Sequence, residues 1–155
     1  MVRFRLMEEQ DVEAVSKIEK ETFSMPWHPE DFLDMIRNEN SYYVVAEEVT
    51  QTGFWVQKKI IASGGVMNIL GEGDITNIVV EASERGKGIG TALLTFLMEE
   101  GKKLGITAYT LEVRVSNEAA IHVYEKLGFV SEGIRRGFYE HPKEDAILMT
   151  LEFEA

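Results

Sequence analysis

The chain of 155 residues is 45% hydrophobic and 28% charged, as expected for one ordinary globular domain spanning residues 1–155. It has no cysteine, which excludes disulfides, thiolate metal sites and a cysteine nucleophile, and a reducing cytoplasm is the expected location. The formal net charge of −11 argues against nucleic-acid binding, and no apolar run approaches the roughly 20 residues of a membrane span.

The first half of the chain predicts one strand, two helices and three further strands. The expected elements are a strand at 2–7, helices at 11–23 and from 29 to about 40, and strands at 42–48, 60–69 and 74–80. Val12, Val15 and Ile18 share one face of the first helix. The segment 50–59 is expected to join two paired strands. Its apolar part, residues 51–56, could be a self-association patch, but strand packing is the favoured interpretation.

The second half predicts a glycine-rich turn, two more helices and three more strands, in the order helix, strand, helix, strand, strand. The expected elements are the turn at 85–90, a helix from about 91 to 105, a strand at 107–115, a helix capped by Asn117 and running to 127, and strands at 129–134 and 146–153. Leu93, Leu94, Leu97 and Met98 form an apolar stripe on the first of these helices. The whole order, βααβββαβαββ, predicts an α/β fold with a mixed central sheet flanked by helices.

The turn Arg85-Gly86-Lys87-Gly88-Ile89-Gly90 stands between an apolar strand and a helix. Its glycines let backbone N–H groups approach an anion, and the helix that follows points the positive end of its dipole at the same place. The spacing fits neither a Walker A loop nor a dinucleotide-binding fingerprint, which would need a third glycine where Thr91 stands. Taken alone, the turn is equally consistent with a pyrophosphate site, to which Arg85 and Lys87 supply positive charge, and with a helix entry that binds nothing.

Three residues of the strand and helix after the turn could form a second part of the same site. Glu112 lies on the strand face opposite Leu111 and Val113, where it is either a functional carboxylate or an ordinary solvent-facing residue. Tyr124 shares a helix face with apolar residues, so a core tyrosine is the alternative to a functional hydroxyl. Asn117 needs no role beyond the helix cap.

Taken together, these segments resemble the GNAT superfamily of acyl-CoA-dependent N-acetyltransferases, and within it the bacterial ribosomal-protein-alanine N-alpha-acetyltransferases. The turn matches the superfamily's pyrophosphate motif, R/Q-x-x-G-x-G/A. The resemblance covers nearly the full length and is carried by Pro26-Trp27, Asn77-Ile78-Val79-Val80, Leu111-Glu112-Val113-Arg114, Ser116-Asn117, Ala119-Ala120-Ile121, Tyr124-Glu125-Lys126-Leu127-Gly128-Phe129, Ile134-Arg135-Arg136, Tyr139 and Glu144-Asp145-Ala146-Ile147.

The resemblance implies that acetyl-CoA is the co-substrate and lies between two parallel central strands that splay apart, here residues 74–80 and 107–115. The cofactor-binding residues that it implies are Ile78, Val79, Val80, Arg85, Gly86, Lys87, Gly88, Ile89, Gly90, Thr91 and Asn117. It further implies that Glu112 is the base that deprotonates the acceptor amine and that Tyr124 is the acid that protonates the leaving thiolate. Since no cysteine can carry the acyl group, direct transfer in a ternary complex is the expected route.

The acceptor implied by the resemblance is the N-terminal alpha-amine of a protein, with a small-subunit ribosomal protein as the favoured partner. We expect Trp27, in the loop 25–29, and Tyr139, in the segment 138–142, to line the acceptor site, although Trp27 could instead anchor its loop by packing. Two alternatives stay open. One is a related enzyme that acts on a lysine side chain, a polyamine or another small amine, and the other is a non-catalytic acyl-CoA-binding or partner-binding module.

Metal ions are not expected, because His28, His122 and His141 lack any spacing typical of metal ligands. Neither nucleic acid nor a membrane is expected as a partner. The sequence leaves the oligomeric state open.

Overall fold

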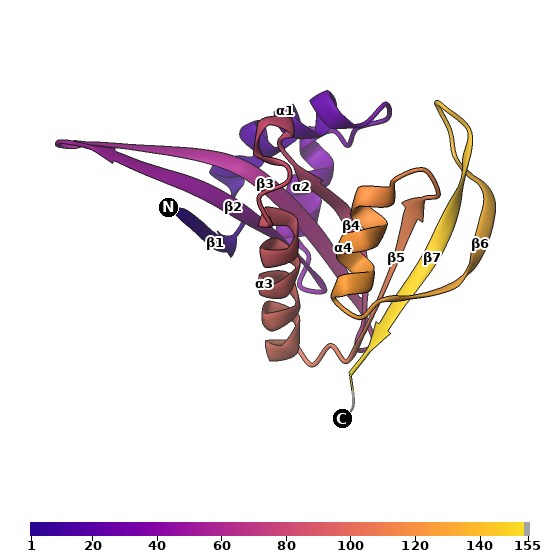
Figure 1. Cartoon of the computed structure of the whole chain (residues 1–155). Coiled ribbons are helices and arrows are strands. Elements are labelled where there is room, and N and C mark those ends of the chain that lie inside the picture. Colours follow the sequence, from indigo (N-terminus) through magenta and orange to yellow (C-terminus); the bar gives the residue numbers. More distant parts are fainter. Residues whose placement is uncertain (154–155) are drawn as a thin grey trace.

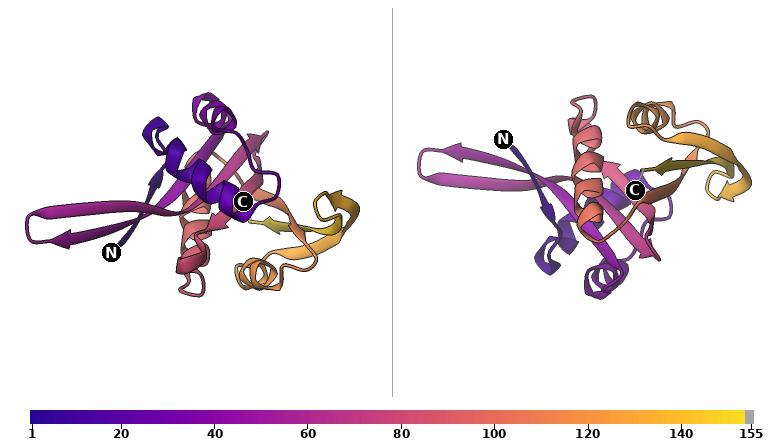
Figure 2. Two further views of the ribbon diagram at one scale, coloured as in Figure 1. Left: turned by 90° about the horizontal axis from the view of Figure 1, so that it is seen from above. Right: turned by 90° about the horizontal axis from the view of Figure 1, so that it is seen from below.

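A mixed sheet of seven strands runs through the molecule in the order β1-β2-β3-β4-β5-β7-β6, with helices on both faces (Figures 1 and 2). The structure is a computed structural model that describes residues 1–153. The strands are β1 (Val2–Leu6), β2 (Ser41–Thr52), β3 (Trp55–Ile69), β4 (Glu72–Val80), β5 (Ala108–Arg114), β6 (Val130–Tyr139) and β7 (Glu144–Glu152). The helices are α1 (Val12–Thr22), α2 (Pro29–Arg37), α3 (Ile89–Lys103) and α4 (Glu118–Lys126), with short 3-10 turns η1 (Glu9–Asp11) and η2 (Ala82–Glu84). The predicted fold class and order of elements are confirmed.

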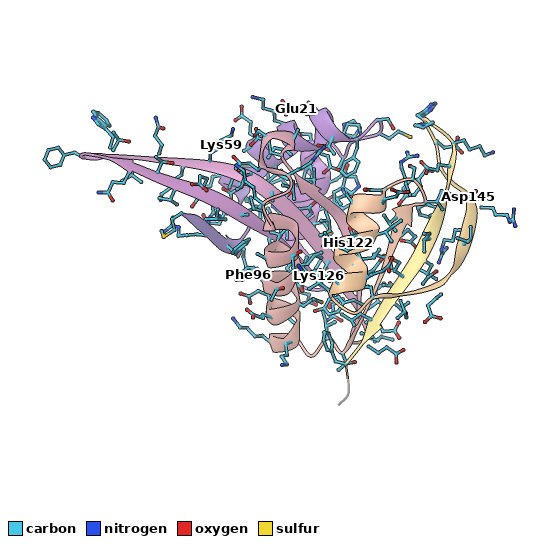
Figure 3. The ribbon with its side chains drawn as sticks, viewed as in Figure 1. Glu21, Lys59, Phe96, His122, Lys126 and Asp145 are labelled. Carbon is cyan, nitrogen blue, oxygen red and sulfur yellow. The ribbon has the colours of Figure 1, made fainter. Side chains whose placement is uncertain are left out.

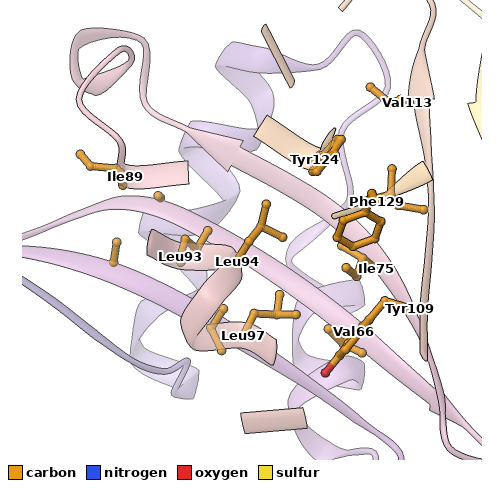
Figure 4. Packing of buried hydrophobic residues seen from close by; sticks show 14 of the residues in the cluster. Val66, Ile75, Ile89, Leu93, Leu94, Leu97, Tyr109, Val113, Tyr124 and Phe129 are labelled. Atoms are coloured by element: carbon orange, nitrogen blue, oxygen red, sulfur yellow. The ribbon is translucent and has the colours of Figure 1, made fainter. Parts of the chain in front are cut away.

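Both faces of the central sheet are buried, because its middle strands carry apolar residues on both sides. Along β2, Tyr43 and Val45 pack in the core with α1 and α2, whereas Tyr42 and Val44 pack in the core with α3 and α4. Figure 4 shows part of this second core, with Leu93 and Leu97 of α3 and Tyr124 of α4 labelled. The apolar stripes predicted for α1 and α3 are confirmed, since Val15, Leu93, Leu94 and Leu97 have no exposed surface. Each such side chain contributes about 1.5–3 kcal/mol of apolar burial. Among the helices of residues 1–153, none has the length and apolar character that a membrane span requires.

Two helix ends differ from the prediction by a few residues, because local capping decides them. α2 ends at Arg37 rather than near residue 40, since Asn38 adopts an extended conformation and its side-chain oxygen accepts the N–H of Asn40 (2.8 Å). α3 begins at Ile89 rather than near residue 91, since Gly88 has a left-handed φ of 80° and serves as its N-cap.

The β2–β3 and β6–β7 hairpins extend farther than the sequence predicted. β6 continues to Tyr139 and β7 begins at Glu144, so a short turn joins them. β2 continues to Thr52 and β3 begins at Trp55, which makes residues 50–59 part of a two-stranded ribbon rather than an irregular connection. This β2–β3 ribbon projects from the body of the molecule (Figures 1 and 2).

The tip of the β2–β3 ribbon is apolar and exposed. Trp55 and Val56 are 80% and 53% exposed and Phe54 is fully exposed, so the favoured interpretation of residues 51–56 as packed against the sheet is wrong. The reason is the length of the two strands. β2 extends beyond its pairing with β1, and β3 extends beyond its pairing with β4, so no neighbouring strand flanks the tip within residues 1–153. At the base of the ribbon, Lys59 (labelled in Figure 3) pairs with Glu81 at 3.0 Å.

The parallel strands β4 and β5 separate soon after they begin. They pair at three positions, Glu72–Ala108, Gly73–Tyr109 and Asp74–Thr110. Farther along, β4 stays with β3 and β5 stays with β7, so a gap opens between them. The register of β4 against β3 also shifts, and within this irregularity Asn77 takes a left-handed φ of 45°. Bulges of this kind bend a strand. The expected splaying of the two central strands is confirmed.

Candidate active site

A cavity of about 690 Å³ lies where β4 and β5 separate. Its walls come from parts of the chain that are far apart in sequence. α1 and the loop after it contribute Glu19, residues 22–25 and Trp27, β4 contributes residues 74–78, β5 contributes residues 112–114, α4 and its cap contribute Asn117 and Tyr124, and the β6–β7 turn contributes residues 138–142. Since α1 and α4 pack on opposite faces of the sheet, the cavity connects the two faces through the gap.

The cavity brings together one part of the predicted site and leaves another part outside. Of the predicted residues, those that line it are Trp27, Ile78, Glu112, Asn117, Tyr124 and Tyr139. Val79 instead buries its side chain in the core with α1 and α2. Val80 and the glycine turn with Thr91 lie farther on, where β4 leads into α3.

Glu112 projects from β5 on the face opposite the α3–α4 core, because strand side chains alternate between faces. Leu111 and Val113 are buried in that core, while the Glu112 side chain is 23% exposed. Burial raises the pKa of the Glu112 carboxyl and the carboxylate of Asp74 raises it further, whereas the guanidinium of Arg135, whose Nε lies 3.4 Å from Oε1, lowers it. Glu112 is therefore not a freely solvated strand residue, and its surroundings suit a group that accepts a proton.

Tyr124 belongs to both the core and the cavity. It is buried, and its ring packs on that of Phe129 with 5.8 Å between centroids. Burial raises the pKa of the Tyr124 hydroxyl, and the neighbouring Tyr139 hydroxyl raises it further. Tyr124 therefore keeps its proton at neutral pH, so the two alternatives for this residue, a core tyrosine and a proton donor, are compatible.

Asn117 caps α4, as predicted, and also lines the cavity. Its side-chain oxygen accepts the N–H of Ala120 at 3.2 Å, which satisfies one of the free amides at the start of the helix. The capping role and a contact with a ligand in the cavity use different atoms of the same side chain, because the amide NH₂ remains available.

The glycine turn leaves the first amides of α3 without acceptors inside the helix. Gly88 is the N-cap of the helix and has no side chain to bond its free amides. The first helical hydrogen bond runs from the N–H of Ala92 to the carbonyl of Gly88 (3.1 Å). The N–H groups of residues 89–91 therefore point out of the helix end. Gly86 and Gly88 both have φ of 80°, and a Cβ atom at either would meet no atom of residues 1–153 within 4 Å apart from its chain neighbours, so the space in front of the amides is open. Open amides at the positive end of a helix suit an anion.

The two cations of the turn make local contacts. Arg85 Nε donates to the carbonyl of Val80 (3.0 Å), and Lys87 Nζ lies 3.0 Å from a carboxylate oxygen of Glu84. Both cations are exposed, so each contact contributes about 1 kcal/mol or less and a phosphate can compete for them.

The edge of β4 beside the gap offers main-chain groups. The N–H of Glu81 donates to Ile61 of β3 (2.8 Å), and main-chain groups along a strand alternate between its two edges. The N–H and C=O of Val80 therefore face away from β3, and Ile78 follows the same alternation. The C=O of Val80 accepts Arg85 Nε, but no main-chain group of another strand pairs with this edge within residues 1–153, so the edge can bond an extended partner.

Trp27 and Tyr139 lie at the part of the cavity formed by the α1–α2 loop and the β6–β7 turn. The ring of Trp27 packs near those of Phe32 and Tyr43, with centroids 5.4 and 6.3 Å away. Trp27 thus anchors its loop by packing and also lines the cavity. Burial and the Glu112 carboxylate raise the pKa of Tyr139 to about 12.

Arg114 holds the β6–β7 turn against the cavity. Its guanidinium lies over the ring of Tyr139, 4.4 Å from the centroid. It also donates to the carbonyls of Glu140 (3.2 Å) and Pro142 (2.9 Å) and pairs with Glu144 (3.2 Å). Together with the pairing of Tyr139 and Glu144, these contacts of Arg114 hold the turn beside β5.

Sequence reasoning missed Glu19, Asp74 and the roles of Arg114 and Arg135 around the cavity. Glu19 could have been found, because a glutamate on the apolar face of α1 is out of place for a surface helix. Asp74 could not, because its proximity to Glu112 depends on the pairing register of β4 with β5.

Comparisons with known proteins agree with this geometry. Residues 12–129 match the acetyltransferase (GNAT) family. The chain is 36% identical over 147 residues to the [ribosomal protein bS18]-alanine N-acetyltransferase of Escherichia coli, covering 94% of this chain and 93% of the relative. The crystal structure of the Escherichia coli ribosomal-protein-S18-alanine N-acetyltransferase superposes with a TM-score of 0.85 at 34% identity over 100% of this chain and 96% of that one. Arabidopsis thaliana NAA60 in complex with acetyl-CoA shares the fold, with a TM-score of 0.87 at 17% identity over 98% of each chain.

Proposed function

This chain belongs to the GNAT family of acetyltransferases, and on that basis we propose that it transfers an acetyl group from acetyl-CoA to the N-terminal alpha-amine of a protein. The proposed acceptor is a small-subunit ribosomal protein, as in the name of the Escherichia coli relative. We further propose that residues 1–155 act as one catalytic domain in the cytoplasm. The observation that carries the proposal is the cavity through the sheet, which Glu112 enters from β5 and Tyr124 from α4.

Acetyl-CoA fits the residues around the gap. The main chain of Ile78 and Val80 offers a strand edge to an extended arm, whereas that of Val79 faces β3. The open amides of residues 89–91 suit a pyrophosphate at the start of α3. Arg85, Lys87 and Asn117 supply polar side chains beside that path. When bound, the co-substrate supplies the acetyl thioester that the amine attacks.

We assign the proton transfer from the acceptor amine to Glu112. A chain amino terminus has a pKa of about 7.7–8.0 and a lysine side chain of about 10.4, so the former is easier to deprotonate. The raised pKa of Glu112 makes it a stronger base than an exposed glutamate, acting directly or through one water. Arg135 limits this effect and keeps the carboxylate available at neutral pH.

We assign the second proton transfer to Tyr124. As the amine nitrogen bonds to the acetyl carbon, the carbon–sulfur bond of the thioester breaks and the thiolate of CoA leaves. A tyrosine that keeps its proton can donate it to this sulfur. Since the chain has no cysteine to carry the acetyl group, transfer occurs directly between the two bound substrates.

Trp27 and Tyr139 are the proposed walls of the acceptor site. They come from the two segments that bound the cavity on the side of α1 and β6, and both present aromatic rings to it. A chain terminus that enters between them reaches toward Glu112, which projects from β5 on the face opposite the α3–α4 core.

A transfer assay tests this function. The protein is incubated with acetyl-CoA and a panel of ribosomal-protein N-terminal peptides, lysine peptides with blocked termini, and polyamines, and mass spectrometry locates the added acetyl group. We expect acetylation of free termini, with selectivity among the peptides. Acetylation of lysine or polyamine alone would overturn the proposed acceptor, and binding of acetyl-CoA without any transfer would point to a binding module.

A single substitution tests the base in the same assay. Glu112→Gln should lower kcat about 10²- to 10⁴-fold at neutral pH, because it removes the proton acceptor while keeping the shape of the side chain. Glu125→Gln, at an exposed position of α4, is the matched control and should leave the rate unchanged.

A further inference from the structure

Glu19 is a carboxylate inside the protein that the proposed chemistry does not use. It lies on α1, is 1% exposed, and sits on the buried face of the helix together with Val15 and Ile18. Buried carboxylates are normally paired with a cation or accept several hydrogen bonds. Here Oε1 accepts one, from the side-chain amide of Asn77 (2.9 Å), and Oε2 has no hydrogen-bond partner within residues 1–153.

Asn77 stands at the bulge of β4 in a conformation that few residues adopt. Its φ of 45° lies in the left-handed region, which asparagine tolerates better than most side chains but still at a cost. Both ends of the residue are held from outside the strand, because its carbonyl accepts the hydroxyl of Tyr43 (3.4 Å) and its amide donates to Glu19. The next residue along β4 is Ile78, whose main chain faces the gap.

We propose that Glu19 is a positioning residue, which holds Asn77 at the β4 bulge and thereby sets the direction in which the main chain of Ile78 faces the gap. The inference rests on the proposed function, since acetyl-CoA is the ligand that would meet this edge. α1 carries Glu19 to the side of the cavity where the α1–α2 loop begins, so Glu19 lines the cavity beside the residues of β4 that it positions.

The groups that face Glu19 are uncharged. They are the hydroxyl of Tyr43 on β2, the amide of Asn77 on β4 and the backbone amide of Trp27 in the α1–α2 loop. Burial raises the pKa of Glu19 to about 7, against the smaller opposing effect of the Trp27 amide. Oε1 can accept the Asn77 hydrogen bond in either protonation state, so the contact survives while the carboxyl titrates.

A double-mutant cycle tests whether Glu19 acts through Asn77. Glu19→Leu removes the acceptor, and Asn77→Gly removes the donor while keeping a residue that adopts positive φ readily. We expect each to lower kcat/KM for acetyl-CoA about tenfold, as for loss of one hydrogen bond to a buried polar group. If Glu19 works through Asn77, the double variant also loses about tenfold rather than about a hundredfold. Glu19→Gln keeps an oxygen for Asn77 and should stay within about twofold of the parent.

Binding supplies a readout that does not depend on transfer. Calorimetric titration with CoA should show about a tenfold weaker Kd for Glu19→Leu and Asn77→Gly, and the parent value for Glu19→Gln. The backbone amide resonance of Ile78 should also shift in both weakened variants. Glu21→Gln, two residues farther along α1 and exposed (labelled in Figure 3), is the control for loss of a charge on this helix. Circular dichroism confirms that each variant is folded, and Asn77→Gly still tests the proposal if Glu19→Leu does not fold.

Different results separate this inference from the proposed function. Parent-like CoA binding in both Glu19→Leu and Asn77→Gly would overturn the positioning role even if the parent protein acetylates peptides well. Multiplicative losses of about a hundredfold in the double variant would also overturn it, because Glu19 would then act by another route. Weakened CoA binding in a protein that transfers no acetyl group would retain the positioning role and reject the proposed activity.

Discussion

Replacing Arg135 by glutamine should make the enzyme less active on the acid side of its pH profile if Glu112 is the base. The guanidinium lies 3.4 Å from the Glu112 carboxylate and lowers the pKa of that carboxyl. A base acts only when deprotonated, so without the cation Glu112 holds its proton to higher pH and kcat/KM falls on the acid limb. Asp74 raises the same pKa, so Asp74→Asn should shift the acid limb to lower pH.

The size of the effect follows from the exposure of the ion pair. Two unit charges 3.4 Å apart in bulk water attract each other by about 1.2 kcal/mol. The Arg135 side chain is 53% exposed, and exposed pairs contribute about 0.2–1 kcal/mol. An effect of about 1 kcal/mol changes the ratio of ionised to protonated base roughly fivefold, so we expect up to about a fivefold loss of kcat/KM on the acid limb. On the plateau, where the base is fully ionised, the loss should vanish.

The assay is kcat/KM for an acceptor peptide between about pH 5 and about pH 9 at constant ionic strength. Arg136→Gln is the matched control, since it removes the same charge from an exposed neighbouring position of β6. Shifts of Arg135→Gln and Asp74→Asn in the same direction, or no shift in either, would show that Glu112 is not the group that titrates on the acid limb.

Three further predictions concern the turn, the core and the buried carboxyl. Arg114→Met should raise KM for the acceptor peptide roughly tenfold with little change in kcat, because it releases the β6–β7 turn; an unchanged KM in steady-state kinetics would contradict this. Gly101→Ala should cost about 1–3 kcal/mol in urea unfolding, since its Cβ would overlap the Tyr109 hydroxyl. Burial raises the folded-state pKa of Glu19 from 4.5 to about 7, so the free energy of unfolding should fall by up to about 3 kcal/mol as pH rises through this interval. Urea unfolding of Glu19→Gln should show a weaker fall of the free energy of unfolding over the same pH range.

The parts of the site that lie within one element, or across one turn, could be predicted from the sequence. Alternation along β5 placed Glu112 opposite the buried Leu111 and Val113, and the glycines before α3 predicted backbone N–H groups that an anion can approach. Both follow from local rules, since strand side chains alternate faces and glycine permits positive φ. Asn117 as the cap of α4 is of the same kind.

The relations that cross between elements could not be predicted. Asp74 lies near Glu112 because of the register in which β4 pairs with β5, and Glu19 meets Asn77 because a bulge turns that side chain toward α1. Neither register nor bulge leaves a clear pattern in a single sequence. The prediction that residues 51–56 are packed is wrong for a related reason. Apolar residues such as Trp55 predict burial, but β2 and β3 extend beyond the strands that flank them, so their tip is exposed.

The separation of β4 from β5 is built into the packing of the strands on either side of it. At the middle of the three paired positions, a Cβ atom on Gly73 would come within 2.7 Å of the ring of Tyr109 and 3.1 Å of Val66, so glycine is what lets the two strands lie close there. A few residues later the bulge at Asn77 bends β4 away, while β5 remains fully paired with β7. Because β4 is packed closely against β5 at one end and bends away from it at the other, a gap opens between β4 and β5. The gap therefore follows from the packing of the strands, and under the proposed function it lets the two substrates approach Glu112 and Tyr124 from opposite faces of the sheet.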